Sequence, residues 1–136
     1  MNNLFLPRIF DNHKFDNEFP IFKIDTNKFC ATEPFTYKDK WKIICNNYTV
    51  MDDNECIFAN TDYRSWILTL PSNPTHKYRV QIIDYFGTWD RNNLIIYHNG
   101  NKIMSVKENF ICDIKNCYLI FKFDIIEKNW EIGMKK

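Results

Sequence analysis

Two strand-like segments separated by prolines decide the fold of this chain: Trp66-Ile-Leu-Thr-Leu-Pro71-Ser-Asn-Pro74 and Tyr78-Arg-Val-Gln-Ile-Ile-Asp84. In a strand, alternate side chains point to the same face of the sheet. Three large apolar side chains of each segment therefore share a face, namely Trp66, Leu68 and Leu70 in the first and Tyr78, Val80 and Ile82 in the second. Pro71 and Pro74 lack backbone donors and end the first strand. The pattern predicts two strands that face one core.

A third signal follows in Asn92-Asn-Leu-Ile-Ile-Tyr-His-Asn-Gly-Asn-Lys-Ile103. Asn99-Gly100 is typical of a type I′ turn, in which both central residues take positive φ. Such a turn predicts a hairpin over residues 93–106, with Leu94 and Ile96 in register with Ile103.

Short runs rich in Ile, Val, Phe, Tyr and Trp continue with period two from Trp41 onward, and helical spacing is nowhere sustained. We expect strands near residues 41–50, 55–59, 64–70, 78–84, 93–98, 101–106, 109–112, 117–125 and 129–134. This pattern predicts an all-β fold, an antiparallel β-sandwich that is jelly-roll-like and occupies residues 41–136.

Residues 1–40 have a different character, since apolar bursts alternate with polar turns and prolines. We interpret them as an extended N-terminal arm. Its large apolar residues are too many for a disordered tail, so they should cover an edge of the domain or dock on another chain. The residues expected to make this attachment are Leu4, Phe5, Leu6, Ile9, Phe10, Phe19, Ile21 and Phe22.

Charge and hydropathy exclude several kinds of partner. Eighteen basic and seventeen acidic residues leave a net charge of +1, and residues 1–40 carry six of each sign, so nothing favours nucleic acid. The apolar runs fall far short of the roughly 20 residues of a membrane helix. Asn2 and Asn3 replace the basic start of a signal peptide. We expect a soluble, unexported protein without a membrane or nucleic-acid partner.

Five cysteines form an odd set without a Cys-x-x-Cys spacing: Cys30, Cys45, Cys56, Cys112 and Cys117. Only three histidines could help them to bind zinc, so we expect buried free thiols rather than a metal site. Such thiols suit synthesis in a reducing cytoplasm.

No constellation of side chains indicates catalysis or a cofactor. The acidic run Asp52-Asp53-Asn54-Glu55 lacks the spacing and the glycine of a calcium loop, and we interpret it as a solvated turn. His13, His76 and His98 have no telling neighbour, and the three glycines are too scattered to cradle a phosphate. We therefore expect a protein that is not an enzyme.

An aromatic loop follows the strand that ends at Asp84. Tyr85, Phe86 and Trp89 could stack on a sugar ring, which would make the loop a glycan platform. The competing interpretation, which we favour, is that Phe86 and Trp89 pack across a sheet edge or a subunit interface.

The order of motifs resembles the small β-domain that recurs in bacteriophage fibre, head-decoration and tail-adaptor proteins. The matching motifs are Leu70-Pro71, Pro74, Val80 to Asp84, Gly87, Asn99 to Ile103 and Asn129-Trp130. The resemblance covers roughly residues 41–134 and implies a trimeric module that acts as a knob, collar or connector in the virion, without catalysis.

We thus expect a structural virion protein of a bacteriophage, assembled in the host cytoplasm, that joins the particle as a decoration, cement, adaptor or fibre-base subunit. A homotrimer would bury Ile67, Ile83 and Ile95, which a monomer would leave facing outward. Its partners would be other copies of the chain and capsid or tail proteins. Two alternatives stay open: a carbohydrate-binding module that recognises a host-surface glycan, and a monomeric regulator that grips another protein through Asn-rich loops.

Overall fold

The computed structural model describes residues 35–37 and 40–135, and every regular element in them is a β-strand. The predicted attachment residues between Leu4 and Phe22 lie outside the described residues, so the arm stays a prediction. The strands are β1 (Phe35–Tyr37), β2 (Trp41–Ile44), β3 (Tyr48–Thr49), β4 (Glu55–Ala59), β5 (Trp66–Thr69), β6 (Arg79–Ile83), β7 (Leu94–Tyr97), β8 (Lys102–Ile103), β9 (Phe110–Cys112), β10 (Tyr118–Asp124) and β11 (Asn129–Met134).

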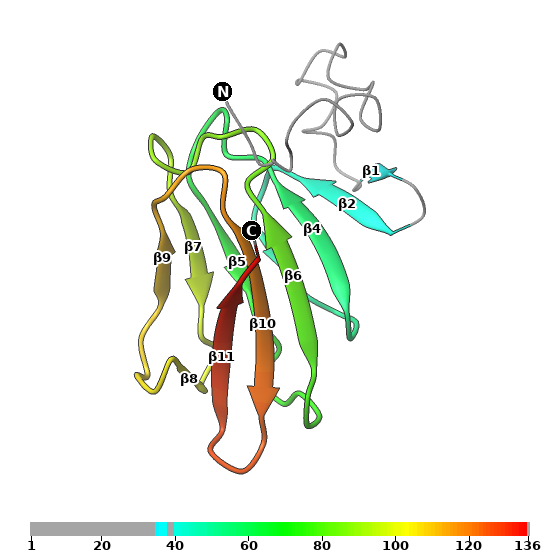
Figure 1. Ribbon diagram of the computed structural model, residues 1–136, viewed down its shortest axis with the longest axis vertical. Helices are drawn as coiled ribbons and strands as arrows, with labels where there is room; N and C mark the ends of the chain where they lie inside the picture. The colour runs from blue at the N-terminus through cyan, green and yellow to red at the C-terminus, as the bar shows by residue number, and fades with distance from the viewer. Residues whose placement is uncertain (1–34, 38–39, 136) are drawn as a thin grey trace.

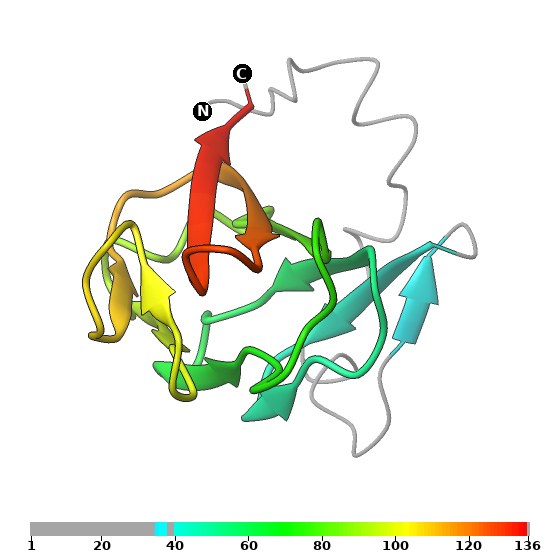
Figure 2. The same ribbon diagram turned by 90° about the horizontal axis from the view of Figure 1, so that it is seen from below.

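The strands form two sheets that pack face to face as a sandwich (Figure 1). The seven-stranded sheet has the order β1-β2-β4-β6-β10-β11-β8, and the four-stranded sheet has the order β3-β5-β7-β9. Seen from below in Figure 2, the two layers enclose the space between them. The all-β, sandwich-like prediction is confirmed.

The predicted strand positions agree with those observed with three exceptions. Strand β1 was not predicted, because residues 35–37 fall in the segment interpreted as the arm, yet it pairs with β2 in the seven-stranded sheet. Strand β8 is shorter than the predicted 101–106, and one predicted strand is split. The segment 41–50 contains two strands, β2 and β3, which belong to different sheets. Residues 45–47 between them form a bend that takes the chain from one layer to the other.

Both sheets are mixed, so the expectation of purely antiparallel pairing is wrong. Strands β2, β4 and β6 are parallel neighbours in one sheet, and β3, β5 and β7 are parallel neighbours in the other. From β2 to β7 the chain alternates between the two sheets, so successive strands lie in different sheets. Each strand from β4 to β7 pairs with the strand two before it in the sequence. This winding does not establish the predicted jelly roll.

The hairpin predicted over residues 93–106 is also wrong, although its turn has the expected local conformation. Asn99 and Gly100 both have positive φ, of 51° and 96°. However, β7 pairs with β5 and β9 in the four-stranded sheet, whereas β8 pairs in parallel with β11 in the other sheet. The Asn-Gly turn thus passes the chain between the layers, and Leu94 lies opposite Cys112 instead of near Ile103.

The main core fills the space between the sheets, as the alternating pattern predicts. The apolar sets 66, 68, 70 and 78, 80, 82 are all buried there. Ile57, Ile82 and Leu119 form one row across the seven-stranded sheet, because they are partners in the ladders β4–β6 and β6–β10. The sandwich is thus held by side chains from both halves of the described chain.

A second apolar cluster covers the other face of the seven-stranded sheet. Ile43, Phe58 and Ile83 are register partners on β2, β4 and β6 and are almost fully buried. The Trp41 ring stacks on Phe58 with 4.8 Å between ring centroids. Strand β4 is therefore buried on both faces, which is typical of an interior strand with parallel neighbours.

Candidate functional site

The outer face of the four-stranded sheet carries an exposed row of isoleucines. Ile67 on β5 is the register partner of Ile95 on β7, which is the partner of Ile111 on β9. Ile67 is 39% exposed and Ile111 is 47% exposed, and Ile95 is half-buried between them. We call these three residues the isoleucine row. The structure thus brings together two of the three predicted interface residues, and it adds Ile111.

Ile83, the third predicted interface residue, lies elsewhere. Its side chain is 3% exposed and belongs to the second cluster with Ile43 and Phe58, on the far side of the seven-stranded sheet. The prediction that Ile83 is exposed in a monomer is therefore wrong. The reason is that aromatic side chains, among them Trp41 and Tyr85, pack against the outer face of this sheet.

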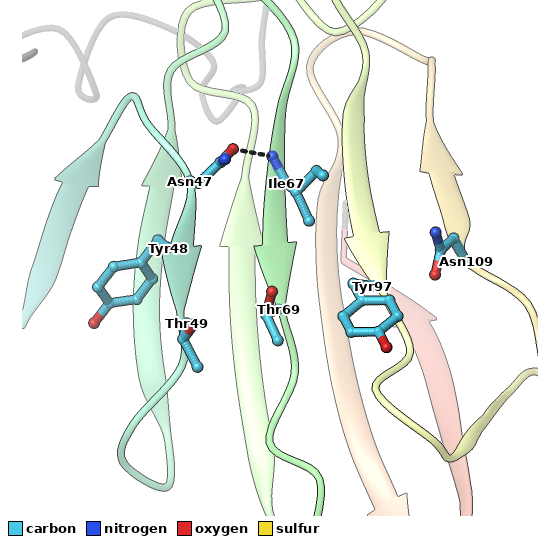
Figure 3. A pocket seen from close by; sticks show the side chains of 7 residues that line it. All are labelled: Asn47, Tyr48, Thr49, Ile67, Thr69, Tyr97 and Asn109. Carbon is cyan, nitrogen blue, oxygen red and sulfur yellow. Dashed lines mark hydrogen bonds between the residues drawn. The ribbon is translucent and has the colours of Figure 1, made fainter.

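A shallow hollow of about 400 Å³ adjoins the isoleucine row (Figure 3). We call it the outer groove, and its lining comes from β3, β5, β7 and the segments next to them. The lining residues are Asn47, Tyr48, Thr49, Ile67, Thr69, Tyr97 and Asn109. Thr49, Thr69 and Tyr97 are register partners and form a second row beside the isoleucines.

Two asparagines at opposite ends of the outer groove are fixed by the backbone. Asn47 Oδ1 accepts a hydrogen bond from the Ile67 N–H at 2.9 Å, and Asn109 Oδ1 accepts one from the His98 N–H at 3.3 Å. Because each amide oxygen already accepts a hydrogen bond from the backbone, the NH₂ group of each side chain is the part left to donate hydrogen bonds to a ligand. The groove therefore combines donors, hydroxyl groups and a tyrosine ring with an aliphatic border.

Tyr48 on the groove rim belongs to a polar cluster with Lys42 and Glu55. The Tyr48 hydroxyl donates to Glu55 Oε1 at 2.6 Å, and Lys42 Nζ donates to the Tyr48 hydroxyl oxygen at 3.1 Å and to Glu55 Oε1 at 3.2 Å. Glu55 Oε2 accepts hydrogen bonds from the backbone N–H groups of Met51 and Asp52. Burial alone would raise the pKa of Glu55, but these hydrogen bonds outweigh it and hold the pKa below its usual value.

The acidic run 52–55 therefore has a structural role that the sequence pattern did not predict. Glu55 is buried and anchors the turn that precedes it, whereas Asp52, Asp53 and Asn54 are exposed, as a solvated turn requires. Asp53 Oδ1 accepts a hydrogen bond from the Arg79 N–H at 2.8 Å and so ties the turn to β6.

The aromatic loop, considered above as an alternative glycan platform, has its tryptophan inside the protein. Trp89 is fully buried in the main core, and its Nε1–H donates to the Ala59 carbonyl oxygen at 3.2 Å. Tyr85 and Phe86 are half-buried against the second cluster, with Tyr85 tilted on Phe58. A buried Trp89 has no face to offer a sugar, so the assignment of this residue to a platform is wrong.

A second, smaller groove of about 80 Å³ lies where the sandwich opens beside β9. It is almost wholly apolar, and its lining comes from β9, the segment after it, β10, β11 and Trp89. Ile114 is 63% exposed and Met134 is 64% exposed at its mouth, while Cys117 and Leu119 form its buried floor. We call it the β9 groove.

The remaining candidates from the sequence have structural surroundings. Cys56, Cys112 and Cys117 are buried free thiols, as predicted, and Cys30 lies outside the described residues. Burial raises the pKa of Cys117 to about 11. His98 Nδ1 accepts a hydrogen bond from the Gly100 N–H, and His76 Nδ1 accepts one from the Ile125 N–H. Within residues 35–37 and 40–135, no three His, Cys, Asp or Glu residues gather as metal ligands.

Sequence reasoning missed Ile111, Tyr97, Asn47 and Asn109 as members of the exposed face. The sequence did carry one signal, the alternation of inward and outward side chains along each strand. Ile111 precedes the inward-facing Cys112, just as Ile95 precedes the inward-facing Ile96, so both isoleucines face outward. This alternation does not reveal which strands are neighbours. The antiparallel partner of β7 is β9 rather than β8, the next strand in the sequence, so the row could not be assembled from the sequence.

Comparison with known proteins gives no relative: no protein-family model matches the sequence, and no curated protein matches it significantly. In the described part of the chain, no helix is long and apolar enough to span a membrane.

Proposed function

We propose that this chain is a structural virion protein of a bacteriophage, a non-enzymatic and homotrimeric subunit that joins parts of the particle as a decoration, cement, adaptor or fibre-base protein. The observation that carries the proposal is the isoleucine row, an aliphatic surface aligned across three strands of the outer sheet face. The resemblance of residues 41–134 to small β-domains of phage particles supports the choice of particle.

The isoleucine row suits a surface that is buried on assembly. Single exposed apolar residues are common on soluble proteins, but an aligned and continuous group marks an interaction surface. Tyr97 lies 39% exposed beside the row, and tyrosine is enriched at the centre of protein interfaces. A threefold assembly around this face would remove both from water.

The test is the mass of the full chain in solution, measured by light scattering after size exclusion. The proposal predicts three times the mass of one chain, and it predicts that Ile67→Lys reduces the mass to that of one chain. Ile126→Lys is the matched control, because Ile126 is 79% exposed in the turn between β10 and β11 and lies outside the row. A trimer unchanged by Ile67→Lys would remove the row from the interface, and a monomeric parent chain would overturn the trimer.

A second candidate function is recognition of a host-surface glycan, and the outer groove is the observation that favours it. Asn47 and Asn109 offer amide donors, Thr49 and Thr69 offer hydroxyl groups, and Tyr97 offers a partly exposed ring. Sugars are bound by this combination of planar polar groups and an aromatic face.

The two functions are separated by a glycan array probed with the parent chain and with Tyr97→Ala. Binding by a monomeric parent that Tyr97→Ala abolishes would favour the glycan module. A trimer without glycan binding would favour the structural subunit.

A further inference from the structure

The β9 groove lies beside an unpaired strand edge. Within the described residues β9 is the last strand of its sheet and pairs only with β7, in the register Leu94–Cys112, Ile95–Ile111 and Ile96–Phe110. No other described strand pairs with the backbone groups on its other side, so this edge can accept a further strand. An added strand would run along the mouth of the groove, between β9 and the exposed side chains of Ile114 and Met134.

The chemistry of the groove indicates what kind of strand fits. Its lining is apolar except for Asp113 at the end of β9. Addition of an extended peptide to a sheet edge draws affinity from main-chain hydrogen bonds and specificity from alternate side chains that enter a pocket. The occupant should therefore be an extended apolar segment that carries a positive charge.

The chain itself contains such a segment in Leu4-Phe-Leu-Pro-Arg-Ile-Phe10. Six of its seven residues are apolar, and its one charge, on Arg8, complements Asp113. Pro7 has no N–H and is tolerated in an outermost strand only when its nitrogen faces away from the sheet. In that orientation the backbone N–H and C=O groups of Leu6 and Arg8 face β9. The backbone groups of Phe5 and Ile9, like those of Pro7, face away from it, because alternate residues of a strand are oriented alike.

The connection to the segment is long enough to reach another domain. Residues 11–34 link it to β1, and 24 extended residues span about 80 Å. In both Figure 1 and Figure 2, β1 and β9 lie on opposite sides of the domain, so the chain enters the sandwich on the side remote from the groove. A segment that binds the groove of the next copy would connect domains head to tail, and such contacts close into a ring when the rotation permits.

We propose that residues 4–10 of one copy add as a strand to β9 of a neighbouring copy, with apolar side chains in the β9 groove and Arg8 beside Asp113. The inference rests on the proposed homotrimer and names the contact that would hold the copies together beside the isoleucine row. It assigns the predicted arm a binding site within the same assembly.

The experiment is disulfide trapping in full-length chains. Leu6→Cys and Ile114→Cys variants are prepared separately, mixed under denaturing conditions, refolded and oxidised mildly. The proposal predicts a covalent species of two chain masses in the mixture that is absent when either variant is oxidised alone. Cys112 and Cys117 in the floor of the groove are buried, so we expect neither native thiol to capture Leu6→Cys in the folded chain. Leu6→Cys mixed with Ile126→Cys is the matched control, because Ile126 is exposed in the turn between β10 and β11, at the opposite end of that hairpin from the groove residues Leu119 and Met134.

The outcomes are distinguishable. A covalent dimer from the Leu6→Cys and Ile114→Cys mixture, but not from the control mixture, supports the proposal. A further variant carries both Leu6→Cys and Ile114→Cys in one chain. If it forms an internal disulfide while the mixture of single variants forms no dimer, the segment binds the groove of its own chain, and binding to a neighbouring copy is overturned. A trimer without any cross-link overturns the strand addition and leaves the proposed function standing, whereas a monomeric parent overturns both.

Discussion

The side-chain carboxylate of Asp84 lies 3.0 Å from the backbone nitrogen of Asn116 and accepts its hydrogen bond across 32 residues of chain. The same carboxylate accepts hydrogen bonds from the N–H groups of Thr88 and Trp89, both at 3.1 Å. Asp84 is fully buried, so it ties the loop after β6 to the loop before β10 inside the protein. This fixed loop is what delivers Trp89 to the core.

Asp84 should make stability depend on pH between 4 and 7. Burial raises its pKa to about 6, in spite of the backbone N–H groups, which lower it. The unfolded value is about 4, so the folded state holds the proton more tightly than the unfolded state. The stabilisation is complete below pH 4 and is lost as the pH rises through 6. We expect the free energy of unfolding of the parent, relative to Asp84→Asn, to fall by about 2 kcal/mol from pH 4 to pH 7.

Urea denaturation of both proteins at a series of pH values measures this difference. Asp84→Asn serves as the reference because it keeps the shape and cannot titrate. If the free energies of unfolding of the two proteins differ by the same amount at every pH from 4 to 7, the pH dependence does not come from Asp84.

Gly87 should be destabilised by a side chain, chiefly through its backbone conformation. Its φ is +68°, and a Cβ built on it would lie 2.9 Å from Asn116 Oδ1, the end of a side chain that can move aside. A left-handed conformation costs a non-glycine residue about 1–2 kcal/mol. We expect Gly87→Ala to lower the free energy of unfolding by about 1–2 kcal/mol. Gly133→Ala is the control, since a Cβ there would have no neighbour within 4 Å; equal effects of the two substitutions, in chemical denaturation, would refute the argument.

Removal of the Tyr48 hydroxyl should weaken the fold in a way that depends on pH. The hydroxyl hydrogen bond to Glu55 helps to hold the pKa of that carboxyl below its usual value. A lowered pKa gives stability that is present above the unfolded pKa and lost as the pH falls. We expect Tyr48→Phe to cost about 1–2 kcal/mol at pH 7 and less at pH 3. Tyr97→Phe on β7, the next strand but one in the same sheet, should leave the thermal midpoint nearly unchanged at both pH values. A Tyr48→Phe effect of equal size at pH 3 and pH 7 would exclude Glu55 as the cause.

The buried thiols should react only when the protein unfolds. Burial raises the pKa of Cys117 to about 11 and raises that of Cys112 further. The thiolate fraction of Cys117 at pH 8 is then roughly 100-fold below that of an ordinary cysteine, and that of Cys112 is lower still, before access is considered. Alkylation followed by peptide mass spectrometry should therefore leave both unmodified in buffer and modify both in urea. Rapid labelling of Cys112 in the folded chain would show that the sandwich opens beside β9.

The sequence pattern located the strands well but not their partners. Period-two alternation predicts which side chains of β5 and β6 face the core, and these are buried. Pairing depends on which strands meet in space, and the Asn99-Gly100 turn shows the difference. Its local dihedral angles follow from the two residues, whereas its neighbours β7 and β8 are drawn into different sheets by β9 and β11.

The candidate site could be predicted only where the exposure of a side chain follows from the alternation of inward and outward residues along its strand. Ile67 and Ile95 face outward, and in the described part of the chain no second layer lies over them, so the alternation of side chains along each strand was enough to predict their exposure. Ile83 also faces away from the main core, but Trp41 and Tyr85 lie with it in a second apolar cluster. Trp89 is in a loop, where periodicity gives no orientation, and its burial depends on the hydrogen bonds to Asp84.

The winding of β2 to β7 has a defined end. Each new strand of this region is added in parallel beside an earlier one, a process that could repeat without limit. Where the next turn would continue, β10 lies antiparallel against β6, and β9 lies antiparallel against β7. The reversal of direction in both layers ends the parallel winding, so a pattern that could repeat is limited to six strands, β2 to β7.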